Sequence, residues 1–347
     1  MVASKADGDN FLSFDQEVFV KELTKVIQSL VPRLDRVVNS YVRFNLFFLL
    51  LLSTEVSLLL GFFGFLLQSS LVAIALSLIF LTVFSYFILK TYLIAKKPEQ
   101  FDDFVERFAR GAESLIKYRE GIPEHHYALA TAFSKMAAAL NRREYAFFKP
   151  PMIFSAFSPT CEKISCNLFW QDFHQMKEML LKRSIEEHLK LIRCEPTNLE
   201  VHASLASAYI NLSNLYHDPR ESEGYDSEIW IPANKYTPAL KEKFSLIAKR
   251  AIEEFKILES YAPNDTWVHS QLAYSYHDLN MPLEEIGEWE AIIRLRPDDK
   301  ESLFKLGKLY FSQGMNGKGL RIYEELRASN YTKAEELIKY YGSWNSI

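Results

Sequence analysis

The sequence predicts an all-α protein, with a two-helix transmembrane hairpin followed by an α-solenoid of about four helical pairs and a C-terminal capping helix. Three observations predict this class. Two long apolar runs adjoin each other within residues 44–95, apolar residues recur at helical spacing elsewhere, and one residue pattern appears four times after residue 123. We therefore expect three parts: an N-terminal amphipathic segment at 1–43, the hairpin at 44–95 and a repeat domain at 96–347.

The N-terminal segment carries a helical stripe of apolar residues. The stripe consists of Phe19, Leu23, Val26, Ile27, Leu30, Leu34, Val37 and Val38. Such a stripe suits a helix that lies on a membrane surface or pairs with another helix, and it equally suits a helix packed on the repeat domain. Both interpretations stay open from the sequence.

The hairpin is the strongest signal in the chain. Phe44 to Leu67 is a run of 24 residues with one charged group, and Leu71 to Leu89 is a run of 19 with none. At about 1.5 Å per residue, each run can cross a hydrocarbon core of about 30 Å. Because only residues 68–70 separate the runs, we expect antiparallel neighbours; a re-entrant wedge in one leaflet remains an alternative.

Positive charge flanks the hairpin at both of its outer ends. The basic residues are Arg33, Arg36 and Arg43 before the first run and Lys90, Lys96 and Lys97 after the second. Positive residues favour the cytoplasmic side, so the sequence predicts an integral membrane protein whose termini and repeat domain are cytoplasmic.

Glu55 lies near the middle of the first apolar run. A charged carboxylate there costs about 2.5–3.5 kcal/mol on insertion scales, so we expect it to be protonated or hydrogen-bonded. Counting outward from the turn places Thr82 and Ser85 at a similar depth, which predicts an interhelical hydrogen bond. A proton-handling or oligomer-forming role for Glu55 is the alternative.

The repeated pattern is clearest at Leu303-x2-Leu306-Gly307-x2-Tyr310. Earlier copies read His269-x2-Leu272-Ala273-x2-Tyr276, His202-x2-Leu205-Ala206-x2-Tyr209 and His126-x2-Leu129-Ala130-x2-Phe133. Each copy predicts the first helix of a pair, and Asn280 and Gly314 stand at equivalent places where the chain turns into the second helix of the last two pairs.

On this pattern, residues 123–331 resemble tetratricopeptide repeats, and residues 332–342 look like a terminal capping helix. The resemblance implies a concave groove that binds a protein or peptide. By position, the groove would be lined by Tyr127, Thr131, Ala203, Ser207, Trp267, Ser270, Tyr274, Glu301, Phe304, Lys308 and Phe311. The first two units depart from the family pattern through extra residues at about 141–172 and 217–238, and segments that fill the groove are a second interpretation.

Chemical motifs are few. With 40 Lys and Arg against 44 Asp and Glu, the charge balance gives no case for nucleic-acid binding. Three cysteines do not suggest a disulfide framework, and Cys161-x4-Cys166 with His174 lacks an evident fourth zinc ligand. No nucleotide-binding, hydrolase or zinc-protease motif occurs, so we expect no catalytic residue, metal or cofactor.

Two functions follow as hypotheses. The first is a membrane-anchored scaffold that recruits a protein partner to the membrane surface, with the bilayer held through residues 44–95. The second is a membrane-active or transport-associated protein in which the hairpin and Glu55 form a homo-oligomer or shape the bilayer, and the repeats regulate assembly. By hydropathy alone, the two-lobed hairpin is also similar to those of chlamydial inclusion membrane proteins, which would place the repeats in a host cytosol.

Overall fold

The computed structural model describes residues 16–66, 71–148, 156–221, 225, 230–232 and 234–342, and these residues form helices, turns and bends with no strand. The chain divides into two compact units. Unit 1 comprises residues 1–187 with 226–235, and unit 2 comprises residues 188–225 with 236–347. The all-helical class is confirmed for the described residues.

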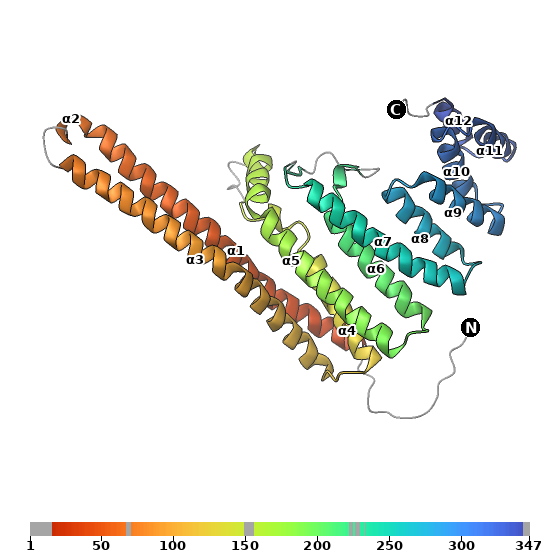
Figure 1. Cartoon of the computed structure of the whole chain (residues 1–347), viewed down its shortest axis with the longest axis horizontal. Helices are drawn as coiled ribbons and strands as arrows, with labels where there is room; N and C mark the ends of the chain where they lie inside the picture. The colour runs from red at the N-terminus through yellow and green to blue at the C-terminus, as the bar shows by residue number, and fades with distance from the viewer. Residues whose placement is uncertain are drawn as a thin grey trace. The chain divides into compact units, whose positions relative to one another are not determined.

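Two long helices of unit 1 lie side by side (Figure 1). They are α1 (Gln16–Gly61) and α3 (Leu71–Ile116), each of 46 residues, with the short α2 (Phe63–Leu66) after α1. The turn predicted at residues 68–70 lies outside the described residues. At about 1.5 Å per residue each helix is about 69 Å long, more than twice a hydrocarbon core. Each helix is therefore longer than a membrane crossing requires.

The N-terminal half of α1 packs against other helices of unit 1 through its apolar stripe. Leu23, Leu34 and Val38 are fully or almost fully buried against the neighbouring α3 and α4. Gly111 of α3 allows a close approach, because a Cβ there would stand 3.2 Å from Val26 Cγ1. The stripe is thus a helix-pairing surface, and α1 continues through residue 43 into the hairpin without a break.

The other halves of α1 and α3 expose their apolar side chains. Both helices are long and apolar enough to cross a membrane, and almost none of their most apolar segments is buried within the protein. Large exposed side chains recur from Leu46 to Ile94, on both helices of the pair. A soluble protein rarely exposes so continuous an apolar surface.

Unit 1 is completed by shorter elements. These are α4 (Pro123–Ala139), the 3₁₀ turn η1 (Arg143–Tyr145) and α5 (Ser158–Cys194), whose last turns belong to unit 2. Ser184 of α5 donates to the carbonyl of Ala130 in α4 at 2.8 Å, which shows how closely the two helices pack. About half of the first predicted insertion is therefore the N-terminal extension of α5.

Unit 2 is a succession of helices, each packed on the next along the chain from α6 to α11. Its elements are α6 (Leu199–Tyr216), η3 (Pro219–Glu221), α7 (Pro238–Tyr261), α8 (Thr266–Asp278), α9 (Pro282–Leu295), α10 (Lys300–Ser312), α11 (Asn316–Ala328), α12 (Ala334–Leu337) and η4 (Ile338–Tyr340). The pairs α8/α9 and α10/α11 share the 34-residue spacing between Thr266 and Lys300.

The turns within these two pairs have the same geometry. Asn280 and Gly314 adopt left-handed conformations, with φ of 54° and 70°. The following amides close each helix, because Met281 N donates to Tyr276 O at 2.9 Å and Met315 N to Tyr310 O at 2.8 Å. This confirms that the two residues serve as equivalent helix stops.

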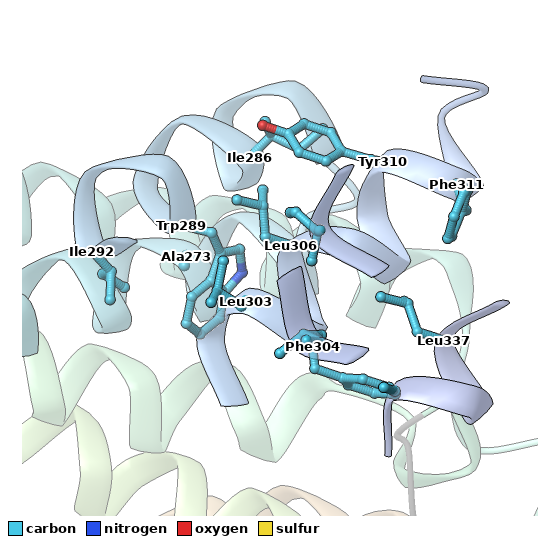
Figure 2. Packing of buried hydrophobic residues seen from close by; sticks show 13 residues of the cluster. Ala273, Ile286, Trp289, Ile292, Leu303, Phe304, Leu306, Tyr310, Phe311 and Leu337 are labelled. Atoms are coloured by element: carbon cyan, nitrogen blue, oxygen red, sulfur yellow. The ribbon is translucent and has the colours of Figure 1, made fainter. Parts of the chain in front are cut away.

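The last pair packs closely at two glycines, where neighbouring side chains occupy the space that a Cβ would need. Figure 2 shows the buried cluster that joins α8 to α12, including Trp289, Leu303 and Leu337. A Cβ on Gly307 would stand 2.7 Å from Leu337, and one on Gly319 would stand 2.6 Å from the Phe311 ring. The segment predicted as a capping helix forms α12 and η4, and Leu337 seals the cluster.

Gly319→Ala should lower the thermal unfolding midpoint of the full-length chain in detergent, followed by circular dichroism. The added methyl would overlap the buried Phe311 ring, and overpacking costs about 1–3 kcal/mol, against a gain of about 1 kcal/mol in helix propensity. Gly287→Ala is the matched control because nothing lies within 4 Å of its Cβ position, so it should leave the midpoint unchanged or raise it. Equal midpoints for both variants would contradict the close approach.

Candidate partner-binding site

Two exposed aromatic residues lie on one face of α8. Trp267 and Tyr274 are each 46% exposed, and their spacing of two helical turns places them on the same side. Buried rings hold both from below: Phe255 contacts Trp267 edge-on at 5.9 Å, and Trp289 contacts Tyr274 edge-on at 5.6 Å. The pair therefore offers rigid apolar area to a partner at little cost in side-chain entropy.

A lysine from α10 joins this face. Lys305 Nζ lies 5.0 Å from the centre of the Tyr274 ring and 5.1 Å from that of Trp289, and it donates to the Tyr274 hydroxyl at 2.8 Å. Lys305 was not among the residues that the repeat pattern places in the groove. Its position in the sequence between the predicted groove residues Phe304 and Lys308 could have indicated it. Only the packing shows that its ammonium reaches α8.

The other predicted groove residues differ in exposure. Ser207 and Glu301 are exposed, while Ala203, Ser270 and Lys308 of unit 2 are partly exposed. Tyr127 and Thr131 belong to unit 1, where Tyr127 is exposed and Thr131 partly exposed. Glu301 is held by the Tyr331 hydroxyl, which donates to it at 2.7 Å, and by Lys333 at 3.4 Å.

Phe304 and Phe311 correct the expected set, because both are buried. Phe304 is 9% exposed, lies beside the Tyr331 ring and belongs to the same cluster as Leu337, so the C-terminal segment covers it. Phe311 is fully buried beside Gly319. The surface of α10 therefore does not expose these two rings.

Aromatic residues of the first insertion pack within unit 1. Phe147 stacks on Phe169 at 4.0 Å, and Ser165 donates to the Glu144 carbonyl at 2.6 Å. The predicted insertion residues 149–155 lie outside the described residues, as do 222–224, 226–229 and 233 of the second insertion. Phe169 and Trp170 of the first insertion are thus buried in the core, whereas Phe157 is 58% exposed.

Three histidines at equivalent repeat positions each pair with a glutamate on the following helix of the pair. His126 Nδ1 lies 2.8 Å from Glu187, and His202 and His269 Nδ1 lie 2.7 Å from Glu254 and Glu288. The sequence indicated packing for the histidines but gave no sign of these partners. In the fourth copy of the repeated pattern, Leu303 stands where the other three copies have histidine.

His269 has acceptors on both ring nitrogens. Nε2 lies 2.9 Å from the Pro263 carbonyl, which can only accept, and Nδ1 faces Glu288 at 2.7 Å with Glu259 at 4.0 Å. Burial by itself lowers the pKa of His269, but the hydrogen bonds to Glu288 and Pro263 and the two carboxylate charges outweigh it, so the pKa is raised. Burial also raises the pKa of Glu288.

In the hairpin, the structure brings Glu55 and Thr82 together. The Thr82 hydroxyl donates to Glu55 Oε1 at 2.8 Å, from α3 to α1. Ser85 lies one turn further along α3 and is partly exposed. Glu55 Oε2 is buried and has no hydrogen-bond partner among the described residues.

Cys161 and Cys166, which the sequence analysis considered as zinc ligands together with His174, lie on α5 in unit 1. Cys161 is partly exposed and Cys166 is buried. Burial raises the pKa of the Cys166 thiol to about 11, which disfavours the thiolate that zinc binds.

The His269 cluster predicts a pH-dependent stability. A raised pKa in the folded state stabilises the fold below the ordinary histidine value of 6.5, and this contribution is lost as the pH rises through the folded value. Glu288, whose pKa is also raised, changes stability in the same direction. The thermal midpoint of the full-length chain should therefore fall between about pH 6 and pH 8, and His269→Gln should flatten the slope.

His277→Gln is the comparison variant. His277 lies on the same helix and also faces a glutamate, Glu285, at 3.1 Å, but its side chain is 51% exposed, so solvent screens its charge. This variant should keep most of the wild-type slope. An unchanged slope in His269→Gln would show that the cluster does not set the pH response.

No protein-family model matches the chain, and a search of curated proteins also gave no match. The exposed face formed by Trp267, Tyr274 and Lys305, called the α8 face below, therefore stands on its geometry as the candidate partner-binding site.

Proposed function

We propose that the protein is a membrane-anchored scaffold of the tetratricopeptide type, which binds a protein segment on the α8 face and holds it at a membrane surface. The observation that carries this proposal is the hairpin itself. Its two helices run side by side and expose apolar side chains from Leu46 to Ile94, while the same helices are buried in unit 1 beyond that stretch.

The anchor is rigid in this proposal. α1 and α3 leave the apolar stretch as continuous helices whose inner faces include Leu34 of α1 and Phe101 of α3, both fully or almost fully buried. No flexible linker separates the membrane segment from the packed part of unit 1. A tether of this kind raises the local concentration of any bound partner.

The repeats supply the binding surface. The 34-residue spacing of α8/α9 and α10/α11, their shared turn geometry and the small residues Ala273 and Gly307 support a tetratricopeptide-type solenoid. Arrays of this type bind extended or helical segments along their first helices. The α8 face offers aromatic area and one cationic group, which suits a segment with apolar anchors beside an acidic residue.

Sidedness follows from the same hairpin. An even number of crossings returns the chain to its starting side, and the basic residues flanking both outer ends favour the cytoplasm. We therefore place both termini, the part of unit 1 outside the hairpin, and unit 2 on the cytoplasmic side.

A second candidate is a membrane-active protein in which the hairpin oligomerises or deforms the bilayer through Glu55. Its supporting observation is the buried Glu55 Oε2, which has no partner in the described part of the chain. The bond from Thr82 to the other oxygen favours a structural role instead, since it ties α3 to α1.

Recruitment tests the scaffold proposal directly. The full-length chain in lipid nanodiscs should capture a cytosolic protein whose retention falls at least about tenfold in Trp267→Ala or Tyr274→Ala, as expected for an aromatic hot spot. The readout is quantitative mass spectrometry of the captured proteins. Truncation at residue 96 is unsuitable, because it would remove the α1 stripe from the core of unit 1.

Two variants control this experiment. Leu283→Ala removes a 63% exposed apolar side chain from α9 and should leave capture unchanged. Glu55→Gln should also leave it unchanged, whereas loss of capture in Glu55→Gln would favour the second candidate. Equal losses in Leu283→Ala and Trp267→Ala would refute a specific site on α8.

Cys194 provides a test of sidedness without any added residue. This cysteine is exposed in unit 2, so a membrane-impermeant maleimide should label it only from the cytoplasmic face of sealed vesicles. Cys194→Ser should remove most of that labelling and so identifies the site. Labelling from the opposite face would overturn the proposed topology.

A further inference from the structure

Two hydrogen bonds join α1 to α3 near the end of their exposed apolar stretch. The Tyr86 hydroxyl donates to Asn45 at 3.1 Å, and the Tyr41 hydroxyl donates to Gln100 at 2.6 Å. Four basic residues fall between these two contacts along the helix pair: Arg43, Lys90, Lys96 and Lys97. Because Lys97 is ion-paired, the first three form a separate group. Lys90 and Lys96 are six positions apart on α3, which is about 9 Å of helix length, and Arg43 lies on α1.

These three cations form a basic collar without acidic partners. In the part of the chain that the structure describes, no carboxylate forms an ion pair with any of them. Arg43 and Lys96 are exposed and Lys90 is partly exposed. The contrast with the next residue is informative, because Lys97 turns inward and forms an ion pair with Asp172 of α5.

Tyrosines accompany the two lysines of the collar. Lys90 Nζ lies 5.1 Å from the centre of the Tyr86 ring, and Lys96 Nζ lies 5.8 Å from that of Tyr92, which is 59% exposed. Tyrosine with an outward-reaching lysine is the side-chain combination of a membrane–water interface, where the ring borders the acyl chains and the ammonium reaches the phosphates.

We propose that the collar of Arg43, Lys90 and Lys96 binds the headgroups of anionic phospholipids. The proposal rests on the membrane anchor proposed above and names the lipid class that it prefers. An uncompensated cation near an anionic surface gains about a fivefold preference over a neutral one. Residues 67–70 at the opposite end of the hairpin include no basic residue, so the preference belongs to one leaflet.

The test uses the purified full-length chain in neutral detergent micelles. Phosphatidylglycerol and phosphatidylcholine are titrated separately, and bound lipid is counted by native mass spectrometry. We expect phosphatidylglycerol to bind more tightly, and the triple variant Arg43→Gln, Lys90→Gln, Lys96→Gln to lose most of that preference, with each single variant losing about fivefold. Inorganic phosphate in a third titration should not displace the lipid, because a bare anion gains nothing from the apolar edge.

A charge-matched variant separates local recognition from net charge. Lys182→Gln, Arg250→Gln and Lys318→Gln also remove three positive charges, but from exposed residues that are ion-paired with Glu178, Glu253 and Glu290. This variant should keep the lipid preference. Equal loss in both triple variants, no preference in the unmodified chain, or displacement by phosphate would overturn the inference.

Vesicle flotation distinguishes this failure from failure of the anchor. A chain that floats with vesicles but shows no anionic preference retains the proposed anchor and refutes the collar. A chain that does not float with vesicles of either lipid refutes both.

Discussion

The contact between α1 and α3 is the interaction on which the rest of unit 1 depends. One pair of helices has two environments: its apolar half is exposed and its other half carries a stripe that includes Leu23 and Leu34, buried against α3 and α4. Close approach at Gly111 and the Thr82–Glu55 hydrogen bond fix the pair at two distant levels. Because the helices do not break between these levels, the exposed apolar stretch and the core of unit 1 are joined by continuous helices.

Unit 2 is stabilised by contacts between helices that are neighbours in sequence. Its short helices bury little area individually, so each depends on its neighbours. The close contacts fall where small residues leave room for a neighbouring side chain. Gly307 and Gly319 allow α10, α11 and α12 to pack with Leu337 and Phe311 between them. The interhelical bond of His269 to Glu288 adds a polar tie at the edge of this apolar packing.

The two proposed binding sites share one feature. On the α8 face, aromatic rings are fixed from below and remain open above, which suits a protein partner. At the collar, lysines reach past tyrosine rings and find no carboxylate among the described residues, which suits phosphate. At both sites the side chain is held in position by a neighbour, and the ring surface or ammonium group that would bind a partner stays accessible.

The sequence by itself determined the helical class, the two apolar helices and the helix stops at Asn280 and Gly314, because hydropathy, periodicity and left-handed turn residues are local properties. It also placed Glu55 and Thr82 at one depth, since counting along two antiparallel helices needs no tertiary information. Only the tertiary structure decided that α1 continues unbroken through residue 43 and that its stripe packs in unit 1, because a stripe does not identify its partner. Burial of Phe304 and Phe311, the reach of Lys305 and the glutamates that pair with the histidines depend on neighbours that are distant in sequence or on side-chain direction, which residue spacing does not encode.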